Sequence, residues 1–136
     1  MKKRWFPGIV GLLFLISCLD PDLPHINGMW QLKTIADEGG NVQTVDTAFY
    51  SFQRQALFSY TLLNGNMNLP EPTQIVYGYI DFPAENKLHI QIDANQYDLL
   101  FLLPWHDQQV TYDILKLNSK ELILRQDGTH YNFIKF

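Results

Sequence analysis

The sequence predicts an all-β fold, a small antiparallel up-and-down barrel of about eight strands, over residues 26–136. Short runs rich in β-branched and aromatic residues alternate there with turn residues, as in strands joined by hairpins. No stretch of this range has the pattern of a long helix. Evenly spaced short strands are typical of sandwiches and barrels, and a closed barrel leaves no unpaired edge strand. The interior of such a barrel holds side chains or one small ligand.

The first segment, residues 1–17, has the pattern of a cleaved export signal. Lys2, Lys3 and Arg4 precede an apolar run at residues 9–16. The run is shorter than the roughly 20 residues that span a bilayer. A basic start, a short apolar core and a small residue before the expected cleavage point are typical of a secretion signal. A short membrane anchor or a buried helix is the alternative interpretation.

Cys18 follows this segment in a context, Leu15-Ile16-Ser17-Cys18, that resembles the bacterial lipobox. The Cys of that motif is lipidated and becomes the new N-terminus. Cys18 is the only Cys in the chain, and a lone thiol in an exported protein stays reactive unless it is consumed. The resemblance implies a lipoprotein of the outer membrane or cell envelope, on the periplasmic or surface face, held by acyl chains such as palmitate. A free or buried thiol is the alternative.

Residues 18–25 are expected to form a lipidated tether. Two Pro and two Asp between residues 19 and 24 exclude a helix and favour an extended spacer. Removal of residues 1–17 takes away three of the 10 basic residues, which leaves 7 against 14 acidic ones and a net charge of −7. Such a surface argues against nucleic acid as a partner, so the lipid on Cys18 supplies the membrane contact. We expect a monomer.

Turn residues divide the domain into eight expected strands. These strands are residues 26–36, 46–54, 56–63, 73–82, 87–93, 110–117, 121–125 and 129–136.

The first four strands are defined by their ends and by alternation. The first ends where Gly39 and Gly40 supply positive φ. The third stops at residues 64–66, Asn-Gly-Asn, and Pro70 and Pro72 make the loop before the fourth irregular. The second alternates between two faces, with Ala48, Tyr50 and Phe52 on one and Phe49, Ser51 and Gln53 on the other.

The later strands are more regular, with one interruption. The fifth places Leu88, Ile90 and Ile92 on one face, as in a strand with one wet side. The last two are joined by Asp127-Gly128, a strong hairpin signal. Residues 94–109 contain a continuous apolar run whose periodicity does not distinguish a strand from a buried helix. We expect a long connection there, part strand or short helical turn, that covers one end of the core.

Gly28-Met29-Trp30, at the start of the first strand, resembles the Gly-x-Trp of lipocalins. With the lipobox and the pattern of the last three strands, the chain is similar to the small lipocalin-like lipoproteins of Bacteroides-type bacteria. The resemblance implies that Trp30 plugs the closed end of the barrel and that Arg125 packs across it, since Arg stacks on indole. Arg54 is the less favoured alternative. The chain is shorter than typical lipocalins and lacks their final helix and disulfide, so strand topology is implied more directly than a deep pocket.

No catalytic or metal-binding pattern occurs in the chain. The four His are far apart and have no Cys partner, so no metal site is implied. The carboxylates are scattered over strand ends and turns, and no Ser lies in a nucleophile elbow. We therefore expect a non-catalytic protein without a cofactor. Two carboxylates facing each other in a cleft would revive the alternative of a hydrolase.

The aromatic residues supply the candidate ligand contacts. A Tyr side chain has an apolar body and a polar tip, which suits a binding pocket or a sugar-binding face. The expected function is a membrane-anchored binding module for a small apolar or amphipathic molecule or a glycan fragment. The alternative is an envelope interaction or accessory protein with a filled barrel and an apolar patch near residues 99–105. The candidate ligand-binding residues are Trp105, Tyr50, Phe52, Tyr77 and Tyr112.

Overall fold

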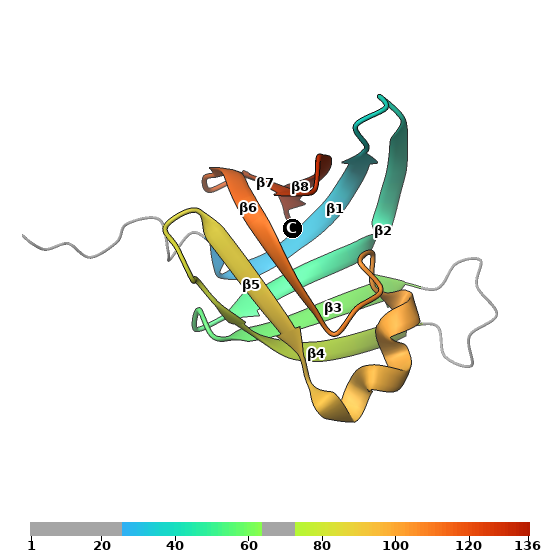
Figure 1. Cartoon of the computed structure of the whole chain (residues 1–136), viewed down its shortest axis with the longest axis vertical. Coiled ribbons are helices and arrows are strands. Elements are labelled where there is room, and N and C mark those ends of the chain that lie inside the picture. Colours follow the sequence, from blue (N-terminus) through green and yellow to red (C-terminus); the bar gives the residue numbers. More distant parts are fainter. Residues whose placement is uncertain (1–25, 64–72) are drawn as a thin grey trace, which may run out of the picture.

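The computed structural model describes residues 26–63 and 73–136, which form a closed antiparallel barrel (Figure 1). Each strand pairs with the next along the chain, and the last pairs with the first, so the predicted up-and-down barrel is confirmed. The elements in order are β1 (Gly28–Ala36), β2 (Val42–Gln53), β3 (Leu57–Leu63), β4 (Thr73–Asp81), β5 (Lys87–Ile92), the 3₁₀ helix η2 (Ala94–Leu102), β6 (Gln109–Leu117), β7 (Glu121–Gln126) and β8 (Thr129–Lys135).

The segments before the barrel lie outside the described residues. They comprise the expected signal peptide and the whole of the expected tether, including Cys18. Within the part of the chain that the structure describes, no helix is long and apolar enough to cross a membrane.

β2 begins at Val42, four positions earlier than the sequence predicts. The backbone of Asp46 has a φ of 62°, so the strand kinks there instead of starting there. Its first residues still pair with the end of β1, where Val42 lies opposite Ala36. The kink is held by an ion pair of 2.7 Å between Lys33 and Asp46 and by a hydrogen bond from Gln31 Nε2 to the Asp46 carbonyl. The hairpin of β1 and β2 therefore projects beyond the barrel wall (Figure 1).

The predicted alternation of β2 and β5 is confirmed. Tyr50 and Phe52 are buried in the barrel, whereas Ser51 and Gln53 point outward. Leu88, Ile90 and Ile92 are likewise buried. Burial of a large apolar side chain stabilises the fold by about 1.5–3 kcal/mol, so the inward faces of the strands supply most of the stability.

One end of the barrel is closed around Trp30. The Trp30 side chain is fully buried and donates a hydrogen bond of 2.9 Å from Nε1 to the Ile26 carbonyl. The cation above its ring is Lys135, whose Nζ lies 4.6 Å from the ring centroid and also donates to the Asn27 carbonyl. Gly28, with a φ of 119°, makes room for this side chain because a Cβ there would lie 2.6 Å from Lys135 Nζ.

The predicted packing of Arg125 across Trp30 is wrong. Arg125 is exposed and donates from Nε and Nη2 to Asp113, at 3.1 and 2.8 Å. Its register partner is His130, which lies opposite Ala36 at the far end of β1 from Trp30. Trp30 is instead opposite Lys135. The first and last strands are thus tied together as expected, but by a different cation.

The interrupted segment forms η2 and a loop that leads into β6. Asp93 caps the helix by accepting a hydrogen bond of 2.9 Å from the Asn95 amide. Leu102 and Leu103 are buried against the core. Residues 94–109 therefore form the expected connection with a helical turn, and they cover one end of the barrel (Figure 1).

Candidate functional site

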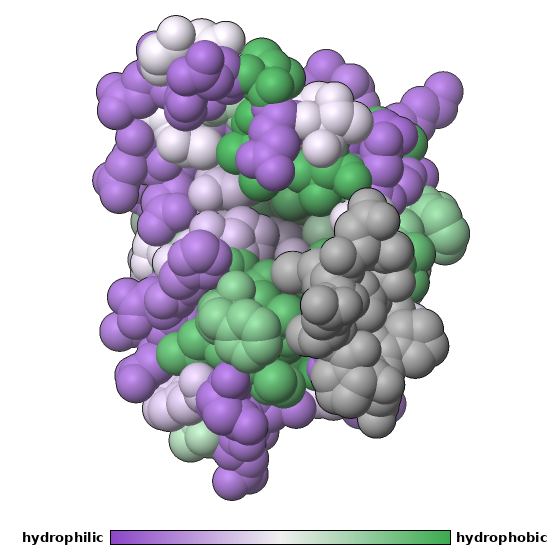
Figure 2. Space-filling model, turned by 90° about the vertical axis from the view of Figure 1, so that its right-hand side faces the viewer, coloured by the Kyte–Doolittle hydropathy of each residue, from purple (hydrophilic) through white to green (hydrophobic). Residues whose placement is uncertain are grey.

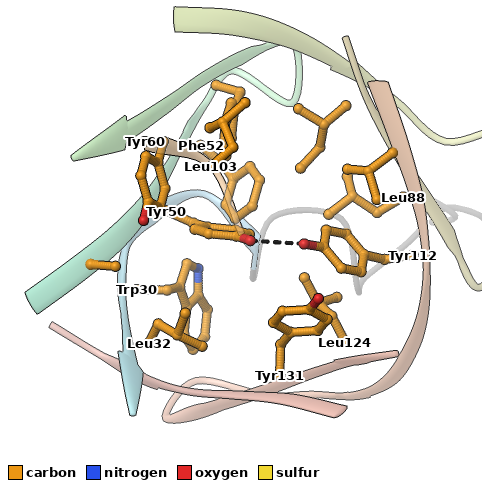
Figure 3. Close-up of a cluster of buried hydrophobic side chains, with 14 of the residues drawn as sticks. Trp30, Leu32, Tyr50, Phe52, Tyr60, Leu88, Leu103, Tyr112, Leu124 and Tyr131 are labelled. Atoms are coloured by element: carbon orange, nitrogen blue, oxygen red, sulfur yellow. Dashed lines mark hydrogen bonds between the residues drawn. The ribbon is translucent and has the colours of Figure 1, made fainter. Parts of the chain in front are cut away.

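The middle of the barrel is bridged by Tyr50 and Tyr112. These residues come from β2 and β6, which face each other across an eight-stranded ring, and their hydroxyls are 2.8 Å apart (Figure 3). Both side chains are fully buried, and burial raises the pKa of each hydroxyl well above its ordinary value. The two hydroxyls thus stay neutral and satisfy each other, and the barrel is filled at this level.

Trp105 enters the interior from the loop after η2. Its ring centroid lies 6.0 Å from that of Tyr50, 6.1 Å from Tyr112 and 6.2 Å from Phe58. Nε1 donates a hydrogen bond of 2.8 Å to the Asp107 carbonyl, which holds the indole in place. Trp105 is therefore a half-buried plug that packs on the tyrosine pair. The loop fills the barrel as well as covering it.

A pocket of about 550 Å³ opens at the end of the barrel opposite Trp30. Its walls come from the end of β1, the start of β2, the end of β3, the start of β8 and the segment of residues 101–104 and 106. Figure 2 faces this side of the molecule, where apolar residues gather in the middle and hydrophilic residues lie to the left of them and at the top and bottom of the view. The pocket is therefore an open mouth with both apolar and polar walls rather than a deep channel.

The lining of the mouth mixes aliphatic and polar side chains, and the polar ones include Gln43, Thr47 and His106. Leu32, Ile35 and Leu62 contribute apolar surface, and Tyr60 and Tyr131 contribute aromatic rings with hydroxyls. Burial raises the pKa of both tyrosines, so both hydroxyls are neutral donors at ordinary pH. The arrangement suits a molecule with an apolar body and one or two hydrogen-bonding groups.

The structure does not bring the five predicted ligand residues into one site. Tyr50, Phe52 and Tyr112 are fully buried and do not line the mouth, and Trp105 packs on the tyrosine pair. Tyr77 lies on the outside of the barrel, where the residue is 52% exposed. Its neighbours Val76 and Gly78 face inward, so strand alternation turns Tyr77 outward.

The residues that sequence reasoning missed are mainly those at the mouth. Tyr60 is the direct register partner of Tyr50, and Tyr131 lies opposite Ile35. Their inward direction could have been inferred from the alternation that places Tyr50 inside. Their common position at one end depends on the register of the whole barrel, which no local pattern reveals.

The ionisable groups on the outer wall form ordinary surface networks. Hydrogen bonds from Lys87 and Arg125 hold the pKa of Asp113 below its usual range. Burial lowers the pKa of His89, but its bonds to Gln109 and Asp81, at 2.8 and 2.9 Å, outweigh that effect and raise it. No group of three metal-ligating side chains occurs in residues 26–63 and 73–136.

Comparisons with known proteins agree with the barrel fold. A family model described as a lipocalin-like domain matches residues 12–136. A lipocalin-like protein from Bacteroides uniformis is 25% identical, with a TM-score of 0.68 over 82% of this chain and 99% of that chain. An uncharacterised protein from Bacteroides eggerthii is 24% identical, with a TM-score of 0.65 over the same shares.

A third solved structure comes from a different kind of organism. Japanin from Rhipicephalus appendiculatus, solved with bound cholesterol, is 17% identical, with a TM-score of 0.58 over 85% of this chain and 80% of that chain. This likeness concerns the fold alone. A search of curated proteins finds no significant match.

Proposed function

The chain belongs to the lipocalin-like domain family, and from this membership we propose that it is a non-catalytic, membrane-anchored binding module. Its ligand is a small apolar or amphipathic molecule held in the mouth of the barrel. The observation that carries the proposal is the pocket of about 550 Å³, whose size lies within the roughly 300–1,000 Å³ of small-molecule sites.

The lining of the mouth defines the class of ligand. Leu32, Ile35 and Leu62 contact an apolar body, which removes hydrocarbon surface from water. Tyr60 and Tyr131 offer hydroxyls to a polar group of the same molecule. Japanin, which shares the fold, was solved with a molecule of this amphipathic kind. The plug formed by Trp105 and the tyrosine pair keeps the ligand near the surface of the barrel.

The membrane part of the proposal rests on Cys18 and the sequence around it. An acyl chain contributes about 0.8 kcal/mol per buried methylene, so several chains hold the protein at the membrane. The domain then presents its mouth within the cell envelope, where amphipathic molecules are abundant near the lipid.

Native mass spectrometry of the mature protein, purified from its own host, tests the ligand. We expect a small molecule that remains bound through purification. In Ile35→Trp, whose larger side chain fills the mouth, the bound fraction should fall at least about tenfold. Met29→Trp is the matched control, because Met29 lies on the outer face of the same strand. Equal occupancy in both variants would place the ligand elsewhere.

A filled barrel that acts as an envelope interaction protein is the second candidate. The bridged interior favours it, and so does Phe101 on η2, whose side chain is 59% exposed. An empty protein that binds no member of a series of fatty acids and sterols would support this candidate and overturn the first.

A further inference from the structure

A second hollow lies on the outer wall of the barrel, over β2, β3 and β4. Its volume is about 240 Å³, and it shares no lining residue with the mouth. The outward-facing side chains around it are Ser51, Gln53, Leu57, Ser59, Tyr77 and Tyr79. We refer to it as the outer groove.

The register of three strands builds the groove. Ser51, Ser59 and Tyr77 lie side by side in one row across the sheet, and Gln53, Leu57 and Tyr79 form the next row. The two serines are small, so they leave a trough beside the larger tyrosines. A sheet surface is otherwise nearly flat, and this hollow arises because small and large residues occupy adjacent strands.

Two aromatic rings form one side of the groove. Tyr77 and Tyr79 lie at alternate positions of β4, and about half of each side chain is exposed, 52% and 51%. The hydroxyl of Tyr79 donates a hydrogen bond of 3.0 Å to Asp93 Oδ2, which fixes the direction of the ring. Exposed, oriented tyrosines are suited to contact a ligand at low cost in conformational entropy.

The rest of the lining is uncharged and, apart from the exposed Leu57, polar on its outward side. Gln53 exposes its amide, and Ser51 Oγ is buried without a hydrogen-bond partner among the described residues. An unpaired buried hydroxyl is unfavourable, and a ligand hydroxyl could satisfy it after rotation of the Ser51 side chain. None of the described residues that line the groove is Asp, Glu, Lys, Arg or His, so an anionic ligand would find no counter-charge there.

We propose that the outer groove binds a neutral saccharide. The C–H face of a sugar ring is weakly positive and packs on the negative face of an aromatic ring, here Tyr77 or Tyr79. The hydroxyls around the sugar exchange hydrogen bonds with Gln53, Ser51 and Ser59. A purely apolar ligand would leave these polar groups desolvated and unpaired. The groove is also smaller than a typical drug-sized pocket, which fits a terminal sugar ring rather than a long enclosed chain.

The test is a titration of the isotope-labelled full-length protein, in a detergent without a sugar head group, followed by amide NMR. The probes are maltohexaose, cellohexaose, mannohexaose and xylohexaose, each up to about 10 mM, roughly ten times a millimolar dissociation constant. At least one probe should shift the amides of Ser51, Ser59 and Tyr77. Tyr77→Ala should weaken that binding at least about tenfold, and Tyr77→Phe should keep it within about threefold, because the ring remains.

Ile75→Ala is the matched control, because Ile75 is also exposed on β4 but does not line the groove. It should leave sugar binding unchanged, and thermal unfolding by circular dichroism should show all variants folded. The proposal is overturned if no probe shifts these amides, if Tyr77→Ala binds as well as the parent, or if the charged polymer polygalacturonate binds more tightly. The ligand of the mouth should be unaffected by Tyr77→Ala, so this outcome is independent of the proposed function.

Discussion

At the scale of single residues, Lys135 joins the first and last strands at the closed end of the barrel. Its ammonium lies over Trp30 and bonds to the Asn27 carbonyl, so Lys135→Met removes a cation–π contact and a charge-assisted hydrogen bond. We expect the free energy of unfolding to fall by about 1–2 kcal/mol. Lys116→Met, which removes only an exposed ion pair, is the control and should change little. Urea unfolding measures both, and equal effects would contradict the role given to Lys135.

The buried Tyr50–Tyr112 pair allows a second prediction at this scale. Either single change to Phe leaves the other hydroxyl buried and unpaired, which should lower the free energy of unfolding by about 1–3 kcal/mol. The double change to Phe removes both hydroxyls and should cost much less than the sum of the single changes. A double-mutant cycle by urea unfolding measures this coupling. Additive effects would show that the hydrogen bond contributes nothing.

The same pair predicts the response to alkaline pH. Burial raises the pKa of both tyrosines above their ordinary value of about 10, so the unfolded chain loses these protons at lower pH than the folded chain. Their contribution to stability is thus complete below about pH 10 and is lost as the pH rises further. The double change to Phe should flatten the fall in stability above pH 10. Unfolding midpoints from pH 8 upward test this, and an unchanged slope would argue against it.

At the scale of elements, the segment with η2 and its loop decides how deep the mouth is. Trp105→Ala should enlarge the interior and lower the free energy of unfolding by about 2–3 kcal/mol, less than for a fully buried Trp because Trp105 is only partly buried. Phe101→Ala, on the same segment but exposed, should have little effect on stability. Urea unfolding compares them, and native mass spectrometry should show longer apolar ligands retained by Trp105→Ala only.

Elements also show which features the sequence could predict. Seven of the eight strands begin within two residues of the expected position, because alternation and turn residues are local signals. The sequence misplaces the start of β2 because Asp is a turn-forming residue type. In the structure Asp46 has a positive φ and kinks a continuous strand. The residue type alone suggests Tyr77 as a ligand contact. Gly78 faces inward, however, so the alternation of β4 turns Tyr77 to the outer wall.

At the scale of the whole molecule, the strand pattern of the sequence predicts that the barrel closes. It does not predict which side chains meet between the first and last strands. That β8 returns to β1 could be predicted from the number of strands and their short turns. That Lys135, and not Arg125, lies over Trp30 depends on the pairing of residues about a hundred positions apart. The mouth is likewise assembled from five separate segments, which no local pattern brings together. Of its residues, only the tyrosines could be predicted from the sequence to face inward.

The anchoring of the whole molecule gives the last prediction. In the parent protein we expect acylated Cys18 as the first residue and recovery in the membrane fraction after washing with high salt, because apolar burial of the chains does not depend on ionic strength. Cys18→Ser removes the thiol that would be acylated. The acyl mass should disappear from the N-terminal peptide in mass spectrometry.

Ser17→Ala is the control for this experiment, because it keeps a small residue before Cys18 and should leave acylation intact. Recovery in the membrane fraction alone is not decisive, because an uncleaved Cys18→Ser chain would stay with the membrane through residues 1–17. Mass spectrometry of the N-terminal peptide shows directly whether the chain is cleaved and acylated. Cleavage at the same position with an acyl chain still attached in Cys18→Ser would show that another residue carries the lipid. The barrel would then be tethered by some means other than the one its N-terminal sequence predicts.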